Sequence, residues 1–247
     1  MDQQDRIIRL GVAGATGRLG RAVMALAADE VGLDAMPLAI RGRGTSDATP
    51  ANAIDVILDV SSDRGCRRAI EVADAQRVPI VIGTTGLQPE TLAAADRLSR
   101  RVAVMIAPNL SRGAAVMRRL AALAAKLAPS EWSFDLVETH RRGKRDAPSG
   151  TALAIVEETV GPDGRSRLRD AVASIRTGEV VGEHRLRMTA WGEELVIEHR
   201  ALDRSVFARG GLDAARWILA APPGRHRFES MIAAALDEDQ GSDPAGT

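Results

Sequence analysis

Short apolar runs alternate with amphipathic segments through the first half of the chain, and this alternation constrains the fold more than any other feature. Each run is almost continuously apolar, which is typical of strands buried on both faces. Such strands, separated by helices, form a parallel sheet with helices on both sides. The predicted strands are Ile7–Ala13, Leu33–Ile40, Asp55–Val60, Pro79–Gly83 and Val102–Ile106. The predicted helices are Arg18–Asp29, Arg64–Gln76 and Pro89–Arg100, and the polar stretch Thr45–Asn52 is expected to be a loop.

The pattern changes after Asn109 and indicates a second domain. An Ala/Leu-rich helix is followed by a strand, another helix near Gly150 and a hairpin that turns at Trp191-Gly192-Glu193. The expected elements are Arg112–Leu127, Trp132–His140, Val180–Ala190 and Glu194–Ala201, with closing helices near Ser205–Leu219 and Arg227–Leu236. We therefore predict an α/β protein: a Rossmann-like doubly wound parallel sheet (1–110 and 212–237), a smaller α+β domain (111–211) and a disordered polar tail (238–247).

Composition excludes several classes of function. The 33 basic and 33 acidic residues give no net charge that would attract nucleic acid or a membrane surface. Aromatic residues make up only 2%, which removes the stacking platforms of single-strand binders. The N-terminal segment MDQQDRIIRL is charged, unlike a signal peptide, and no apolar stretch could span a bilayer, so a cytoplasmic location is expected. The single cysteine, Cys66, is interpreted as a structural thiol, and no metal site is predicted.

A glycine-rich turn follows the first predicted strand and precedes the first predicted helix. The segment GVAGATGRLG places glycines at 11, 14, 17 and 20. Gly14 and Gly17 would let the backbone approach a pyrophosphate, and the helix start would offer it free N–H groups. Small residues also serve ordinary tight turns, but here the strand–turn–helix context of a dinucleotide site is met.

The end of the second predicted strand bears on the choice of cofactor. An acidic residue at this point would bind the ribose 2′-hydroxyl of NAD, whereas an arginine would accept the 2′-phosphate of NADP. The sequence has Ile40 where the acid would stand, followed by Arg41 and Arg43. A solvated basic loop is the alternative. The pattern favours NADPH as the preferred cofactor, with NADH as the second choice.

Two further strand ends are predicted to line the nicotinamide pocket, because ligands of open α/β sheets bind beyond the carboxyl ends of the strands. Each could by itself be an ordinary strand-to-helix turn. The residues concerned are Gly83, Thr84, Thr85, Ala107, Pro108 and Asn109.

A basic loop leading into a helix start is the second candidate site. The loop carries His140, Arg141, Arg142, Lys144 and Arg145, and Ser149-Gly150-Thr151 then opens a helix. Backbone N–H groups at Gly150 and Thr151 would bind a carboxylate, and the neighbouring cations would add charge-assisted hydrogen bonds. A histidine here can donate or accept a proton near neutral pH. The plainer alternative is a solvated charged face with Ser149 as a helix cap.

These motifs together resemble the dihydrodipicolinate reductase family. The resemblance runs from about Ile7 to Trp217, and DAPSGTAL (Asp146–Leu153) is its most specific segment. The other segments that carry it are VAGATGRLG, IGTTG, APNLSRG, ETHRRGKR and VVGEH…GEELVIEHRALDRSVFARGGLDAARWI.

The resemblance implies reduction of a cyclic dicarboxylate by NAD(P)H in lysine and diaminopimelate biosynthesis. It implies that His140 is the general acid, that Lys144 is catalytic and that Gly150 and Thr151 bind a substrate carboxylate, with Arg141 and Ser149 beside them. It also implies a homotetramer formed through the second domain, with the hairpin Val180–Ala201 as the candidate surface; His184 and His199 on this hairpin are interpreted as structural. The implied cofactor contacts are Gly14, Ala15, Thr16, Gly17, Arg18, Leu19, Arg41, Gly83, Thr84, Thr85, Ala107, Pro108, Asn109 and Leu110.

The sequence departs from the family pattern at three places. Arg141 replaces a second histidine, although an arginine can still bind a carboxylate bidentately. Ile40 replaces an acidic residue, and the stretches after Gly44 and around Pro162–Ala171 are short. Two alternatives therefore stay open: a related reductase of another small anionic imine or carbonyl, and a non-catalytic dinucleotide sensor. Retention of both His140 and Lys144 argues against the sensor.

Overall fold

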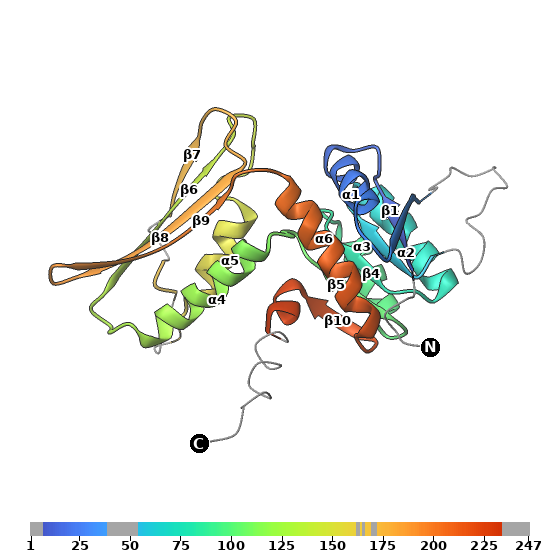
Figure 1. Cartoon of the computed structure of the whole chain (residues 1–247). Coiled ribbons are helices and arrows are strands. Elements are labelled where there is room, and N and C mark those ends of the chain that lie inside the picture. The colour runs from blue at the N-terminus through green and yellow to red at the C-terminus, as the bar shows by residue number, and fades with distance from the viewer. Residues whose placement is uncertain (1–6, 39–53, 162–163, 165, 169–171, 234–247) are drawn as a thin grey trace, which may run out of the picture. The chain divides into compact units, whose positions relative to one another are not determined.

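A computed structural model describes residues 7–38, 54–161, 164, 166–168 and 172–233. The chain divides into two compact units, one built from the residues up to Leu110 and from Ser205 onward, the other from Ser111 to Arg204 (Figure 1). Residues 205–211, predicted in the second domain, lie in the first unit because they begin the continuous helix α6 (Ser205–Trp217). The predicted loop at Thr45–Asn52 and the tail at 238–247 are outside the described residues.

The first unit contains a six-stranded sheet in which every neighbouring pair is parallel, in the order β10-β5-β4-β3-β1-β2. The chain runs outward from β1 in both directions, so the strand order reverses between β1 and β3. All residues of β3 and β4 are buried, and all of them are apolar except Asp59 at the end of β3. The strands are β1 (Ile8–Ala13), β2 (Leu33–Pro37), β3 (Val56–Asp59), β4 (Ile80–Ile82), β5 (Ala103–Ile106) and β10 (Gly224–Arg227).

Helices cover both faces of this sheet. Helices α2 (Asp63–Gln76) and α3 (Pro89–Ser99) bury their apolar sides in a cluster with alternate strand residues such as Ile57, Ile80 and Val104. Helices α1 (Arg18–Ala28) and α6 pack together, and α6 approaches the opposite face so closely that a Cβ on Gly211 would lie 3.0 Å from Leu58. The doubly wound fold is therefore confirmed (Figure 1).

Strand β10 was not predicted. Its sequence, Gly-Arg-His-Arg, has no apolar alternation, because among the described strands it lies at the sheet edge and pairs with β5 alone. The second closing helix was predicted to begin at Arg227. In the structure, helical residues run from Phe228 to Ala233, where the described residues end.

The described part of the second unit is a four-stranded mixed sheet with two helices on one face (Figure 1). Strand β6 pairs in parallel with β7, while β8 pairs antiparallel with both β6 and β9. Side chains of α4 and α5 form a core with alternate residues of β6 and β8, among them Leu136 and Leu186. The elements are α4 (Arg112–Leu127), β6 (Ser133–His140), α5 (Gly150–Glu158), β7 (Val172–Arg176), β8 (Gly182–Ala190) and β9 (Glu193–Ala201).

The predicted hairpin is present and has a tighter turn than expected. Ala190 pairs directly with Glu193, so only Trp191 and Gly192 form the loop, and both have positive φ angles of 45° and 89°. Two-residue turns of this kind match the right-handed twist of the strands. The register that they set places His184 opposite His199, on the face toward the helices.

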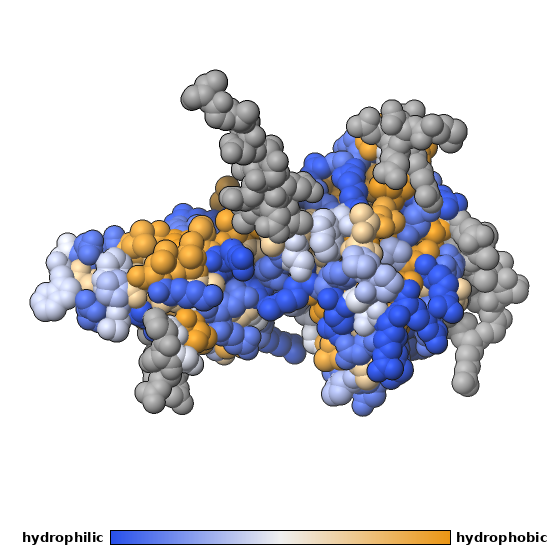
Figure 2. Space-filling model, turned by 90° about the horizontal axis from the view of Figure 1, so that it is seen from below, coloured by the Kyte–Doolittle hydropathy of each residue, from blue (hydrophilic) through white to orange (hydrophobic). Residues whose placement is uncertain are grey.

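Helix α4 exposes an apolar stripe. Val116, Leu120, Leu123 and Leu127 recur at helical spacing and are all exposed, while the opposite side of the helix is buried in the core. Figure 2 shows hydrophobic surface gathered on this unit. Stripes of this kind are typical of surfaces that contact another protein. Among the described helices, none combines the length and hydrophobicity that a bilayer-spanning segment requires.

Candidate active site

The glycine turn after β1 is packed against the end of β3, at the point where the strand order reverses. Gly14 has φ +85°, and a Cβ on it would lie 2.7 Å from the Val60 carbonyl oxygen and 2.8 Å from Ser61 Cα. A Cβ on Gly20 would lie 2.0 Å from the Gly14 carbonyl oxygen, so helix α1 packs directly on the turn. These contacts explain why glycine is needed at positions 14 and 20.

The start of α1 has no side-chain cap, a feature that it shares with α3. Gly17 is its N-cap and offers no side chain to the first backbone N–H groups, and its own N–H donates to the Gly14 carbonyl at 2.9 Å. Serine side chains cap α2, α4 and α5 instead. The uncapped α1 start and the glycine cradle fit the pyrophosphate of a dinucleotide, whose anionic oxygens would accept these N–H groups.

A buried carboxylate links the strand ends beside this turn. The Ser61 hydroxyl donates to the Asp59 carboxylate, and the Ser61 N–H donates to Thr84 Oγ1 at 2.8 Å. The Gly83 N–H donates to the Asp59 carbonyl at 2.8 Å. Burial raises the pKa of Asp59, although hydrogen bonds from Ser61 and Thr84 oppose this. The sequence patterns predicted Gly83 and Thr84 but not Asp59 and Ser61, although an acid at the end of an apolar strand was a signal for Asp59.

The end of β5 joins the same edge. The Ala107 N–H donates to the Ile82 carbonyl at 2.8 Å, and a Cβ on Gly83 would lie 2.8 Å from the Leu110 side chain. The structure thus brings together the predicted residues that follow β1, β4 and β5. Arg41 and Ile40, on which the cofactor preference rests, lie outside the described residues. Cys66 is buried beneath this edge, and burial raises the pKa of its thiol.

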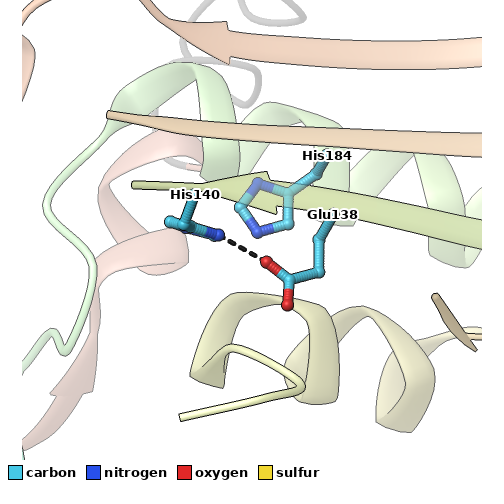
Figure 3. A group of neighbouring side chains, drawn as sticks. All are labelled: Glu138, His140 and His184. Carbon is cyan, nitrogen blue, oxygen red and sulfur yellow. Dashed lines mark hydrogen bonds and ion pairs between the residues drawn. The ribbon is translucent and has the colours of Figure 1, made fainter. Parts of the chain in front are cut away.

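The second unit places His140 at the end of β6 beside a fully buried acid, Glu138. The two residues are two positions apart on one strand, so both side chains point to the helix-covered face. His140 Nδ1 is hydrogen-bonded to Glu138 Oε2 (Figure 3). Burial lowers the pKa of His140, and the carboxylate opposes this effect only in part.

The other oxygen of Glu138 binds two more donors. Arg176 Nη2 lies 2.6 Å from Oε1, and the Ser149 N–H donates to Oε1 at 3.3 Å. Burial raises the pKa of Glu138, but the hydrogen bonds from Arg176, Ser174 and His140 outweigh it, and the net pKa lies below its ordinary value. Glu138 is therefore an anion. Neither Glu138 nor Arg176 was predicted from the sequence.

Two histidines of the hairpin bind the caps of the two helices. His184 Nε2 lies 3.1 Å from the Ser149 hydroxyl, which accepts from the Ala152 N–H at the start of α5. His199 Nε2 lies 3.2 Å from the Ser111 hydroxyl, the cap of α4. The rings of His184 and His140 meet edge to face with centroids 5.2 Å apart (Figure 3). Burial lowers the pKa of His184 to about 4, so it is neutral at neutral pH.

The remaining predicted substrate residues follow His140. Lys144 Nζ lies 2.7 Å from the Asp146 carboxylate, and the Lys144 N–H donates to the Arg141 carbonyl at 3.0 Å. Ser149 is buried and its hydroxyl serves as the cap of α5, which is the plainer alternative read from the sequence. Gly150, by contrast, is exposed at the helix start.

Glu138, His140 and His184 each place one ligand atom within 4.8 Å of the others, close enough to hold a metal ion. The carboxylate, however, already accepts from His140, Arg176 and a backbone N–H, and Arg176 brings a positive charge to it. Within the described residues, this donor set fits a hydrogen-bond network better than a cation site.

Comparisons with known proteins cover nearly the whole chain. The family models described as dihydrodipicolinate reductase, N-terminus and C-terminus, match residues 8–110 and 113–232. A 4-hydroxy-tetrahydrodipicolinate reductase from Xanthomonas campestris pv. campestris is 35% identical over 238 residues, covering 91% of this chain and 98% of the relative.

Solved structures share the fold. A dipicolinate-bound dihydrodipicolinate reductase from Paenisporosarcina sp. TG-14 gives a TM-score of 0.68 at 19% identity, covering 91% of this chain and 99% of that one. An engineered D-amino acid dehydrogenase bound to NADP+ gives 0.53 at 13% identity, with 96% and 99% covered.

A doubly wound parallel sheet with a glycine turn at its switch point places the chain in the dinucleotide-binding class of folds. The mixed-sheet unit adds a histidine that is hydrogen-bonded to a buried carboxylate. Within that class, the matches to both halves and the 35% identity decide the family. The chain belongs to the dihydrodipicolinate reductase family, and the resemblance read from its motifs is confirmed.

Proposed function

We propose that the chain reduces 4-hydroxy-tetrahydrodipicolinate, or the dihydrodipicolinate formed from it by loss of water, to tetrahydrodipicolinate in lysine biosynthesis. The relatives are named for this substrate. The observation that carries the proposal is the grouping of His140, Lys144 and the exposed start of α5 at one end of the second unit's sheet. That group offers a proton donor, a cation and backbone donors for a carboxylate.

The reaction adds a hydride and a proton across one double bond of the conjugated ring, and the 4-hydroxyl, where present, leaves as water. A bound nicotinamide supplies the hydride. His140 gives the proton from Nε2, because Nδ1 is held by Glu138. Lys144 and the N–H groups of Gly150 and Thr151 bind one substrate carboxylate, and Arg141 binds the other. Ser149 supports this site by capping α5.

The dinucleotide binds, in this proposal, along the edge formed by the ends of β1, β3, β4 and β5. The N–H groups at the start of α1 hold the pyrophosphate, and the loops after β4 and β5 line the nicotinamide. The residues assigned to the cofactor are Gly14, Ala15, Thr16, Gly17, Arg18, Leu19, Arg41, Gly83, Thr84, Thr85, Ala107, Pro108, Asn109 and Leu110.

Purified protein is expected to oxidise NADPH when supplied with the product of dihydrodipicolinate synthase. Its kcat/KM for NADPH should be higher than that for NADH. The physical reason for the preference is Arg41, which would pair with the 2′-phosphate. Fluorescence titration of both cofactors, with and without pyridine-2,6-dicarboxylate as a planar substrate mimic, measures the preference directly. Tight cofactor binding without turnover of this substrate would favour another imine or carbonyl substrate, the alternative that Arg141 suggests.

The same proposal includes a homotetramer formed through the second unit. The sheet face opposite α4 and α5 carries cross-strand ion pairs, and none of the described helices of this unit covers it. Arg187 pairs with Asp135 at 2.9 Å, and Arg200 with Glu183 at 3.4 Å. A face of alternating charges can match a second copy of itself.

Native mass measurement is expected to give four times the chain mass of 26.2 kDa. Arg187→Glu, which places like charges beside Asp135, should shift the population toward smaller species. Arg101→Glu reverses an exposed charge that pairs with Asp74 in the first unit and is the matched control. A wild-type protein that stays monomeric at micromolar concentration would contradict the tetramer.

A further inference from the structure

One carboxylate in the second unit connects the proposed proton donor with the proposed carboxylate site. Glu138 is fully buried and accepts from three elements: from His140 on its own strand, from Arg176 on β7 and from the Ser149 N–H at the start of α5. Pairing of β6 with β7 places Arg176 directly beside His140, so the arrangement follows from strand register.

The charge of Glu138 decides which nitrogen of His140 carries a proton. A carboxylate can only accept, so the hydrogen bond between them requires a proton on Nδ1. The neutral ring then keeps Nε2 as its proton-accepting nitrogen, and the protonated ring gives its second proton from Nε2. A Cβ on Gly182 would lie 3.1 Å from Nε2, so glycine at this position leaves room around the reacting nitrogen.

We propose that Glu138 is the positioning residue of the reduction: it sets the tautomer and direction of His140 and, through the Ser149 N–H, fixes the ring relative to the carboxylate-binding start of α5. This inference rests on the proposed function. A single carboxylate between the two groups keeps the proton donor and the substrate in register, which matters because small misplacements of reacting groups cost rate.

Arg176 lowers the pKa of His140, whereas Glu138 raises it. The guanidinium of Arg176 pairs with the same carboxylate that binds the histidine, and its positive charge lies near the ring. The groups that face His140 are Glu138 on β6, Arg176 on β7, His184 on β8 and Lys144 on the following loop, the last paired with Asp146. Because His184 is neutral, removing Glu138 should make protonation of His140 harder, and removing Arg176 should make it easier.

The tautomer of His140 in the wild-type protein is the first test of this proposal. The chain has four histidines, so ¹⁵N-labelled imidazoles can be resolved by long-range ¹H–¹⁵N spectra, with His140→Gln used for assignment. At a pH where the ring is neutral, His140 should show the Nδ1–H tautomer. An Nε2–H tautomer would overturn the proposal, because Glu138 could then receive no hydrogen bond from the ring.

Two variants extend the test in opposite directions. In Glu138→Gln the imidazole of residue 140 should titrate at lower pH than in the wild type, and in Arg176→Gln at higher pH. The fall of kcat/KM at high pH should move in the same directions, and kcat of Glu138→Gln should fall up to about 100-fold because the ring is no longer held in place. Glu131→Gln removes an exposed carboxylate of the same unit and should change neither quantity.

Opposite shifts separate positioning from mere stabilisation, since both variants break the same buried ion pair and a structural role predicts the same loss in both. Unchanged titration of residue 140 in both variants would overturn the inference. If the imidazole shifts are found but the wild type does not turn over dihydrodipicolinate, the proposed reaction is wrong while the role of Glu138 in holding His140 stands.

Discussion

Replacement of His140 by glutamine is expected to lower kcat about 100- to 10,000-fold while leaving NADPH affinity unchanged. Glutamine cannot give the proton that the proposed mechanism takes from His140 Nε2, whereas the proposed cofactor contacts all lie in the first unit. Stopped-flow reduction and equilibrium titration of NADPH measure the two effects separately. His226→Gln, a change in the exposed edge strand β10, is the matched control and should keep full activity.

The pH dependence of kcat/KM of the wild-type protein should report the titration of His140. Burial lowers the pKa of His140, and the general acid must be protonated, so kcat/KM should be high below that pKa and fall as pH rises through it. A bound dicarboxylate adds negative charge near the ring and should move the limb of kcat to higher pH. If kcat/KM of His140→Gln still fell at the same pH as in the wild type, another group would have to donate the proton.

Lys144→Ala is expected to lower kcat/KM about 10- to 150-fold, the loss that follows from removing one hydrogen bond to a charged group. NADPH binding should be unchanged, which distinguishes loss of a substrate contact from loss of the fold. Lys126→Ala removes the only other lysine of the sequence, at an exposed position of α4, and is the matched control.

Lys144→Arg separates charge from geometry. It keeps the ion pair with Asp146 available but replaces a compact ammonium by a planar fork. If kcat/KM of Lys144→Arg lay well above that of Lys144→Ala, the positive charge would be the main contribution of this residue to substrate binding. Turnover of Lys144→Ala equal to the wild type would remove this lysine from the mechanism and reopen the alternative of a different substrate.

Local patterns were sufficient to predict most of the fold. The buried strands of the first unit are mostly apolar runs, and the helix Arg112–Leu127 was predicted with its observed bounds because it is rich in Ala and Leu. The glycines at 14 and 20 could be placed because a tight turn between strand and helix demands them. Strand β10 could not, since an edge strand of polar residues carries no periodic signal.

Of the partners of His140, only Glu138 could have been found from short spacing in the sequence. Glu138 lies on the same face of one strand, and period-two alternation could have identified it. Arg176 and His184 reach the site only through strand register: Arg176 pairs with His140 across β6–β7, and His184 with Glu138 across β6–β8. The order of those strands follows from packing of the whole unit, which local sequence does not specify.

The discontinuous first unit has a consequence for synthesis on the ribosome. Its sheet is completed by β10 and one face is covered by α6, and both elements are translated after the entire second unit. Until α6 emerges, residues such as Leu58 lack a cover on that side. The inserted unit, being one continuous segment, can fold first. Nascent chains should therefore depend on chaperones that shield exposed strands during the interval.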